Sequence, residues 1–318
     1  MQFLQNIKFN YYKNQLEDLY KSSKYEQLFK ILKELQTKDK NLYQHFSAKY
    51  LNLLLKNIEN GNLLNNKIYW INSFDLEDTI YLQNFIKSYF SSIYEHEFHI
   101  KYFNDQIFNL INNSAFDQKL DFNSFLNLNY LVQYDSLNRN DGINFMINNF
   151  AFYEAENAYL FTDPKLTLGY SLLIKNPIMI YQSFKEKSEA QESMNNLLNL
   201  DNRNLIISKN ETSIEVNRQG WPVFNQSWMN ENTKNTFNGN LIKLEELNTN
   251  LEDQLTQIIF HMQQCGIEID IDYSFIKEYS ANNLYKLDIL ENNKFSNKEL
   301  KLLRSSVAEL NTDLKYSI

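Results

Sequence analysis

The chain is poor in the residues on which several classes of protein depend. Only one of its 318 residues is cysteine, three are proline and six are glycine. One cysteine excludes a disulfide-stapled secreted scaffold and a cysteine-rich zinc module, and so few glycines exclude a collagen-like chain. Because the glycines occur singly, the sequence has no glycine-rich loop that could hold the phosphates of a nucleotide, and we expect no cofactor.

Positive charge and long apolar runs are also scarce. Lysine and arginine number 31 against 39 carboxylates, so the chain is acidic and we expect no nucleic-acid partner. No stretch reaches the roughly 18 to 20 apolar residues of a membrane-spanning helix. Residues 1–8 lack the basic stretch and apolar run of a secretory signal, so the expected location is the cytoplasm.

Apolar and aromatic residues are plentiful. They include 23 phenylalanines and 21 tyrosines, and apolar residues make up 43% of the chain, which is enough to bury a core. Asparagine, lysine, tyrosine, phenylalanine and isoleucine share A/T-rich codons. A biased genome therefore explains their abundance together, and an asparagine cluster carries little functional information here.

The first two thirds of the chain read as mainly helical. Apolar residues recur three to five positions apart over residues 16–54, a helical spacing that Gly61 would end. Asp75 and Asp78 mark the start of another helix, because carboxylates stabilise the positive end of a helix dipole. Further elements are expected as strands at 67–71 and 97–103 and as helices at 105–111, 122–134 and 186–200. Residues 143–184 are nearly continuously apolar, which indicates burial on more than one face.

The last third mixes strands with helices. Residues 205–216 predict a β-hairpin, the polar residues 225–240 a linker or long loop, and the leucine spacing over 241–262 a long amphipathic helix. Gly266 is placed to end that helix, and Ser296 with Glu299 forms a capping-box pattern for a final helix.

These patterns together predict a mainly α fold with minor β content (α+β). A helical domain would cover residues 1–200, and a smaller region with the hairpin, the amphipathic helix and a short acidic strand would cover 201–318. A single domain is the alternative to this division.

One acidic pattern suggests chemistry. Glu268, Asp270 and Asp272 alternate with isoleucines, so on a strand all three carboxylates would share one face. Such a cluster could bind a hard cation such as Mg²⁺, as metal-dependent phosphoesterases do. The alternative is the charged outer face of an edge strand, which discourages aggregation.

Two sets of apolar side chains suggest contact with a partner protein. Trp221 and Trp228 lie beside a turn in a polar region, and tryptophans are frequent anchors of interfaces. Leu244, Leu251 and Leu255 belong to the narrow stripe of the amphipathic helix, which fits a helix-packing seam. Both sets could equally pack into the core of the chain itself.

The remaining candidates for chemistry are single residues. His96 and His99 would point the same way only on a helix, and a metal site would need further ligands. Cys265 follows the end of a predicted helix, where the dipole opposes a thiolate, so we expect an inert thiol even with His261 four residues away.

The sequence contains none of the common catalytic motifs. We therefore expect a non-catalytic structural or assembly subunit of a larger complex with other protein subunits as partners, and no catalytic residue. The alternatives are a metal-dependent phosphoesterase that uses the acidic cluster and a secreted effector-like binding protein.

Overall fold

The structure is a computed structural model. It describes residues 2–22, 24–39, 41–43, 45–47, 49–50, 67–112, 119–120, 129, 132–133, 136–137, 142–152, 154–155, 158–159, 162–187, 194, 197–198, 207–209, 214–216, 220–286 and 296–316. Two compact units share the chain, one with residues 1–66, 103–141 and 206–216 and the other with residues 67–102, 142–205 and 217–318. Each unit combines segments that are distant in sequence, and the single division at residue 200 stays a prediction.

The first unit contains the helices expected at the N-terminus. Helices α1 (Gln2–Lys21) and α2 (Tyr25–Lys38) bury Leu16, Leu28, Leu32 and Leu35. The unit also holds α5 (Phe103–Asn112) and an antiparallel sheet of β3 (Lys119–Leu120), β8 (Ile207–Lys209) and β9 (Ile214–Val216). Strands β8 and β9 pair Ile207 with Val216, so antiparallel strands lie where the hairpin was expected.

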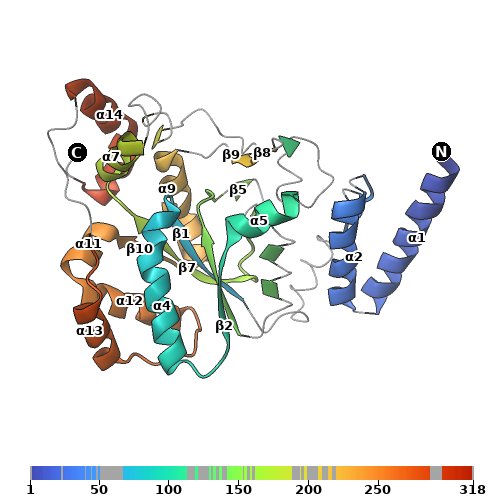
Figure 1. The fold of residues 1–318 in the computed structure, drawn as a ribbon, viewed down its shortest axis with the longest axis horizontal. Helices are drawn as coiled ribbons and strands as arrows, with labels where there is room; N and C mark the ends of the chain where they lie inside the picture. The colour runs from blue at the N-terminus through green and yellow to red at the C-terminus, as the bar shows by residue number, and fades with distance from the viewer. Residues whose placement is uncertain are drawn as a thin grey trace. The chain divides into compact units, whose positions relative to one another are not determined.

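The second unit is built on a parallel sheet of five strands in the order β10-β7-β1-β4-β2. The strands are β1 (Ile68–Ser73), β2 (Phe98–Tyr102), β4 (Ile143–Asn148), β7 (Thr167–Ile174) and β10 (Gly239–Lys243). The prediction of a mainly α fold with minor β content is therefore wrong, because this unit is an α/β fold around a central parallel sheet (Figure 1).

Burial on both faces explains the error. Every residue of β1 and β4 is buried, so these strands lack the alternation of polar and apolar residues that identifies a half-exposed strand. A short, continuously apolar run cannot be distinguished from a buried helix by its period. With valine nearly absent, most of the apolar residues in the strands are isoleucine, leucine or aromatic.

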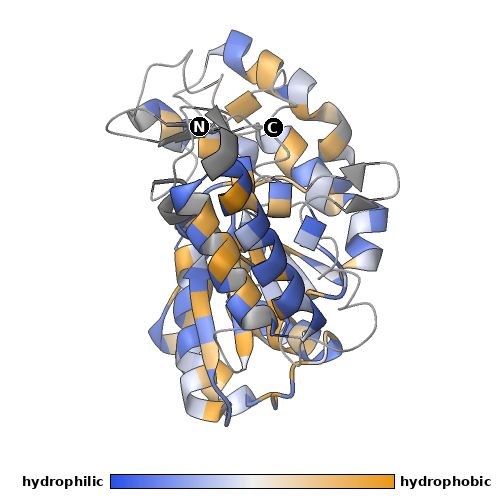
Figure 2. Ribbon diagram, turned by 90° about the vertical axis from the view of Figure 1, so that its right-hand side faces the viewer, coloured by the Kyte–Doolittle hydropathy of each residue, from blue (hydrophilic) through white to orange (hydrophobic). Residues whose placement is uncertain are grey.

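One face of the sheet packs against α4 (Ile80–Ile93), α11 (Leu244–Thr249), α12 (Leu251–Gln264) and α13 (Tyr273–Asn282). Tyr69 and Ile71 of β1 contribute to this core together with Phe85 and Ile86 of α4. In Figure 2, helices of the chain carry hydrophilic and hydrophobic residues side by side, which is the pattern of helices with one buried face.

The opposite face of the sheet carries Trp70 and Tyr170 and packs against α9 (Trp221–Met229). The rings of Tyr170 and Trp228 lie 5.0 Å apart. The other elements of this unit are η1 (Leu76–Thr79), α7 (Pro177–Lys187), α10 (Glu231–Thr236), α14 (Asn297–Leu314) and the two-stranded pair β5 (Glu154–Ala155) and β6 (Ala158–Tyr159).

Three expectations for the last third are corrected. The leucine stripe over 241–262 is not one helix but β10, α11 and α12 in succession, with a break at Asn250, whose φ is −144°. Residues 225–240 are not a linker, since they form most of α9, all of α10 and the start of β10. Residues 267–272 are irregular rather than a strand, although burial still alternates from Ile267 to Asp270.

Several local signals are confirmed. The Ser296 side chain and Glu299 form a complete capping box at the start of α14, and Gly266 takes a φ of +89° after the end of α12. Strands β1 and β2 also lie where short strands were expected. Most of the residues of the two helices expected at 122–134 and 186–200 lie outside the described part of the chain. None of the helices in the described part of the chain has the length and apolarity needed to cross a membrane.

Candidate functional site at the carboxyl edge of the sheet

All five strands are parallel, but the side of β1 on which the chain adds further strands changes after β4. From β1 the chain builds β2 and β4 on one side of it, and then β7 and β10 on the other. In open parallel sheets, ligands bind outside the carboxyl ends of the strands at this switch point, because the loops after neighbouring strands diverge there. The residues that follow β1, β4 and β7 are therefore the first place to look for a site.

Asp78 and Lys175 form an ion pair at this edge. Asp78 lies in η1, directly after β1, and Lys175 follows the last residue of β7. Lys175 Nζ lies 3.0 Å from Asp78 Oδ1, and the two side chains are only 17% and 9% exposed. Burial raises the pKa of Asp78 to about 6 although Lys175 acts to lower it. A carboxyl group with such a pKa can both accept and donate a proton near neutral pH.

Glu245, in the first turn of α11 directly after β10, forms hydrogen bonds to other segments at this edge. Its Oε1 atom accepts a hydrogen bond of 2.7 Å from the backbone N–H of Asn176, next to Lys175. Its Oε2 atom lies 3.2 Å from the hydroxyl of Tyr316, which is also 3.3 Å from the carbonyl oxygen of Ile174. The loop after β7 is thus held by the first turn of α11 and by a residue of the C-terminal segment.

Two buried asparagines form a hydrogen bond between the carboxyl ends of β1 and β4. Asn148, the last residue of β4, donates from Nδ2 to Oδ1 of Asn72 on β1 over 3.0 Å, and both side chains are fully buried. Asn148 also bonds both backbone groups of Phe150, as an acceptor for its N–H and as a donor to its carbonyl oxygen. The amides thereby fix the loop after β4 relative to the end of β1.

The turn after β1 is unsuited to phosphate. A phosphate loop needs glycines and a lysine between the strand and the helix, and residues 74–79 contain neither. The backbone N–H of Glu77 instead donates a hydrogen bond of 3.1 Å to Oδ1 of Asp75. With the carboxylates of Asp75, Glu77 and Asp78 in this turn, an anionic ligand would meet repulsion here.

Helix α14 is tied to α7 beside this edge. Glu299 accepts hydrogen bonds from Tyr181 and, over 3.1 Å, from Lys185, both on α7. Burial acts to raise the pKa of Glu299, but bonds from Ser296, Tyr181 and Lys185 outweigh it and hold the pKa at about 2. Glu299 is therefore ionised at every physiological pH, which suits a structural clamp rather than proton transfer.

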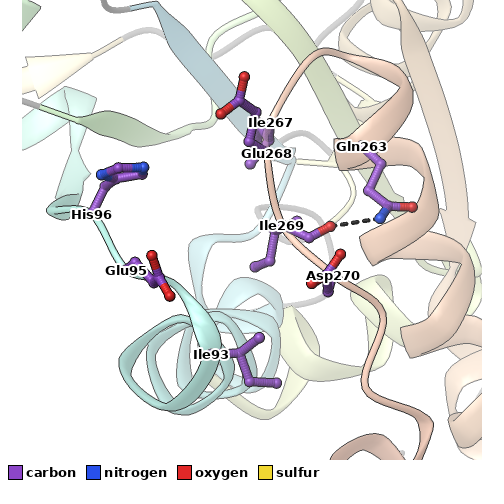
Figure 3. Close-up of a pocket in the computed structure, with 8 residues that line it drawn as sticks. All are labelled: Ile93, Glu95, His96, Gln263, Ile267, Glu268, Ile269 and Asp270. Atoms are coloured by element: carbon purple, nitrogen blue, oxygen red, sulfur yellow. Dashed lines mark hydrogen bonds between the residues drawn. The ribbon is translucent and has the colours of Figure 1, made fainter.

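Two of the acidic residues predicted from the sequence line a cleft at the ends of α4 and α12 (Figure 3). Its volume is about 510 Å³, and Glu95, His96, Glu268 and Asp270 line it together with Gln263 and three isoleucines. Asp272 does not line the cleft, since its carboxylate caps α13 through the N–H of Phe275. In the described part of the chain, no three histidine, cysteine, aspartate or glutamate residues are grouped so as to hold a metal ion.

The predicted partner-binding residues are in the core of the chain itself. Trp221 and Trp228 are 1% exposed, Leu244 and Leu255 are fully buried, and Leu251 packs against the same core. The tryptophan pair and the leucine stripe therefore indicated residues of the core, and neither set forms an exposed surface.

The single thiol, that of Cys265, is buried at the C-terminal end of α12. Burial raises the pKa of Cys265 to about 12, and burial lowers the pKa of His261 to about 4, so both groups are neutral at physiological pH. His261 Nδ1 lies 2.8 Å from the hydroxyl of Tyr69, which is 2.7 Å from Ser171 Oγ. These bonds join α12 to β1 and β7. His99 lies on β2 with its Nε2 atom 3.8 Å from Glu97, and His96 lies apart in the cleft.

Solved structures of other proteins are similar to this chain. The crystal structure of mouse sulfotransferase SULT7A1 complexed with PAP matches with a TM-score of 0.45 and 11% identity, over 77% of this chain and 85% of that chain. No protein-family model and no curated protein matches the chain.

The prediction of a non-catalytic structural or assembly subunit is wrong. It rested on tryptophans and leucines available to partners, and these side chains are buried in the chain's own fold. The second unit is built instead around a five-stranded parallel sheet.

Sequence reasoning missed the residues of the carboxyl edge, although a signal for them exists. Asn72, Asn148 and Lys175 are each the polar residue that ends or directly follows a run of buried apolar residues. Because parallel strands end at one edge, such residues converge. Recognising the runs as parallel strands was the missing step.

Proposed function

We propose that this protein is an enzyme that acts on a small polar molecule at the carboxyl edge of β1, β4 and β7, with Asp78 as the group that transfers a proton. The observation that carries the proposal is the Asp78–Lys175 pair, an almost buried carboxyl group whose pKa is about 6, at the switch point of a parallel sheet. Strongly perturbed carboxyl groups concentrate at active sites, because catalysis needs a pKa near the working pH.

Each partner of the pair has a distinct role in this proposal. In its ionised form Asp78 accepts a proton from the substrate, and the proton returns from the carboxyl group to the product or to water. Lys175 Nζ, 3.0 Å away, stabilises the negative charge that develops on the substrate when the proton leaves. Glu245 is a positioning residue, since it holds the backbone of Asn176 beside Lys175.

The acidic turn after β1 limits the substrate. Asp75, Glu77 and Asp78 repel phosphate, so we expect an uncharged or cationic substrate rather than a nucleotide. The cytoplasmic location and contact with other protein subunits stay predictions from the sequence.

A turnover screen tests the proposal. The protein is incubated with a library of sugars, amino acids and hydroxylated metabolites, and products are detected by mass spectrometry. For any substrate found, kcat/KM is expected to change with an inflection near pH 6. Asp78→Asn is expected to reduce turnover about 10²-fold or more, because general acid–base catalysis contributes about that factor.

The matched control is Glu278→Gln, a carboxylate exposed on α13, which is expected to leave turnover unchanged. Chemical-shift mapping gives a second reading, in which substrates perturb Asp78 and Lys175. Substrates that instead perturb Glu95 and Asp270 in the cleft of Figure 3, or full turnover by Asp78→Asn, would contradict the proposal.

A further inference from the structure

Three buried polar atoms on the α9 side of the sheet have no hydrogen-bond partner among the described residues. They are Nδ2 of Asn72, Nε1 of Trp221 and Oδ1 of Asn225. The side chains of Asn72 and Asn225 are fully buried, and that of Trp221 is 1% exposed. Buried polar groups in folded proteins are almost always paired, so three unpaired groups in one part of the fold need an explanation.

In the side-chain amides of Asn72 and Asn225, one atom is hydrogen-bonded, and that bond fixes which way each amide is oriented. Asn148 must accept from the N–H of Phe150 and donate to its carbonyl, which points Nδ2 of Asn148 at Asn72. Turning the Asn72 amide over would bring two NH₂ groups together. Asn225 likewise donates from Nδ2 to the carbonyl oxygen of Trp221 over 2.9 Å, so its Oδ1 atom has to be the unpaired one.

The three groups belong to the same end of the fold. Asn72 is the last residue but one of β1, and two positions later the ring of Phe74 lies 6.0 Å from that of Phe224 on α9. Trp221 and Asn225 occupy the first two turns of that helix, on either side of Phe224 in sequence. The beginning of α9 thus lies against the carboxyl end of β1, which is the edge that holds Asp78.

Their chemistry specifies an uncharged ligand. Asn72 and Trp221 offer N–H donors, Asn225 offers an acceptor, and none of the three side chains carries charge. The neighbouring rings of Phe74 and Phe224, and that of Phe184 at 6.3 Å from Phe74, form an apolar environment in which an ion would be costly.

We infer that this end of α9 binds the uncharged part of the substrate, a carboxamide or an equivalent carbonyl with an adjacent donor, on an aromatic or apolar body. The carbonyl oxygen accepts from Asn72 and Trp221, and the donor of the ligand pairs with Oδ1 of Asn225. This inference rests on the proposed function, because it assigns the substrate class of the same edge.

The three tryptophans provide a direct test with benzamide as the probe and benzoate as the charged control. The indole N–H of Trp70 already donates to Thr167 at 3.1 Å, and that of Trp228 donates to Phe150 at 2.9 Å. In ¹⁵N–¹H spectra, benzamide is therefore expected to move only the indole signal of Trp221, downfield, and benzoate to move none. Trp221→Phe identifies the signal.

Variants separate a binding role from a packing role. Asn225→Leu removes the unpaired acceptor and also the Nδ2 hydrogen bond to the Trp221 carbonyl, so it is expected to change the melting temperature little, while the Kd for benzamide rises about tenfold through the lost hydrogen bond. Gln226→Leu, on the exposed face of the same helix, is the matched control and is expected to keep the Kd unchanged.

The outcomes distinguish this inference from the proposed function. If benzamide moves no indole signal, or if Asn225→Leu lowers the melting temperature and leaves the Kd unchanged, the inference is overturned, and buried water is what pairs these groups. If benzamide binds as expected but Asp78 titrates near pH 4 and Asp78→Asn keeps full turnover, the inference holds and the proposed role of Asp78 fails.

Discussion

At the scale of single residues, burial decides the chemistry of the ionisable groups in this fold. Asp78 and Glu299 both contact a lysine, yet burial raises the pKa of Asp78 to about 6, while several hydrogen bonds overcome burial and hold that of Glu299 at about 2. The difference lies in deeper burial of Asp78 and in the number of donors, since Asp78 has Lys175 and Glu299 has Ser296, Tyr181 and Lys185. Of these two groups, Asp78 is the one suited to exchange a proton near neutral pH.

The raised pKa of Asp78 predicts a pH-dependent loss of stability. Between about pH 4 and pH 6 the folded protein keeps a proton on Asp78 that the unfolded chain has released, so the free energy of unfolding falls as pH rises through this window. The loss is on the order of 2 to 3 kcal/mol. Urea unfolding of the wild type and of Asp78→Asn, at intervals from pH 4 to pH 7, measures it.

The comparison with Asp78→Asn is necessary because His261 acts in the opposite direction. Burial lowers the pKa of His261 to about 4, so the unfolded chain binds a proton below about pH 6.5 that the folded protein does not bind, and stability is lost as pH falls. His261 is present in both proteins and cancels in the difference. A difference that stays constant from pH 4 to pH 7 would contradict the raised pKa of Asp78.

At the scale of elements, close contact between β7 and the end of α12 holds one face of the sheet to its helices. A Cβ atom on Gly169 of β7 would lie 2.3 Å from Sγ of Cys265 and 3.0 Å from the carbonyl oxygen of Asn238. Only glycine leaves room for this approach. The thiol is therefore best understood as a packing residue, which agrees with a pKa raised by burial.

Gly169→Ala is expected to lower the free energy of unfolding by about 1 to 3 kcal/mol, because the added methyl group overpacks the contact with Cys265. Combining it with Cys265→Ala should recover part of this loss, as a double-mutant cycle in chemical denaturation measures. Gly266→Ala is the control. Its φ of +89° strains alanine, but no atom lies within 4 Å of the added Cβ, so Cys265→Ala should give no recovery.

At the scale of the whole molecule, the described C-terminal segment returns to the carboxyl edge of the sheet. Tyr316 lies within hydrogen-bond distance of Ile174 and Glu245, and Lys243 donates to the carbonyl oxygen of Leu314 over 2.8 Å. Tyr316 is separated in sequence from Glu245 by 71 positions and from Ile174 by 142 positions. The loops of the candidate site therefore depend on contacts that form only when the second unit is complete.

Tyr316→Phe is expected to lower the free energy of unfolding by about 1 to 2 kcal/mol, because the change leaves the Ile174 carbonyl and a carboxylate oxygen of Glu245 without this hydroxyl. Thermal or urea unfolding measures the loss. Tyr273→Phe is the control, since the Tyr273 side chain is 64% exposed and its change should be neutral. Equal stability of the two variants would show that the hydroxyl of Tyr316 contributes nothing.

Local signals in the sequence predicted local structure well. The capping box at Ser296 and Glu299, the glycine after α12 and the antiparallel strands around residues 207–216 are all present, because each depends on neighbouring residues in the chain. The leucine spacing over 241–262 predicted burial correctly but the element wrongly. A strand followed by two helices presents most of the same residues to the core as one long helix would, although Ile242 takes the place of Leu241.

The sequence by itself determined the acidic, aromatic-rich composition, the capped start of α14 and the glycine that follows α12. The tertiary structure alone decided that the apolar runs are parallel strands, and with them the fold class. Parallel pairing joins residues far apart in the chain, so no local pattern specifies it. For the same reason, only the assembled sheet places Asp78 beside Lys175 and Asn72 beside Asn148.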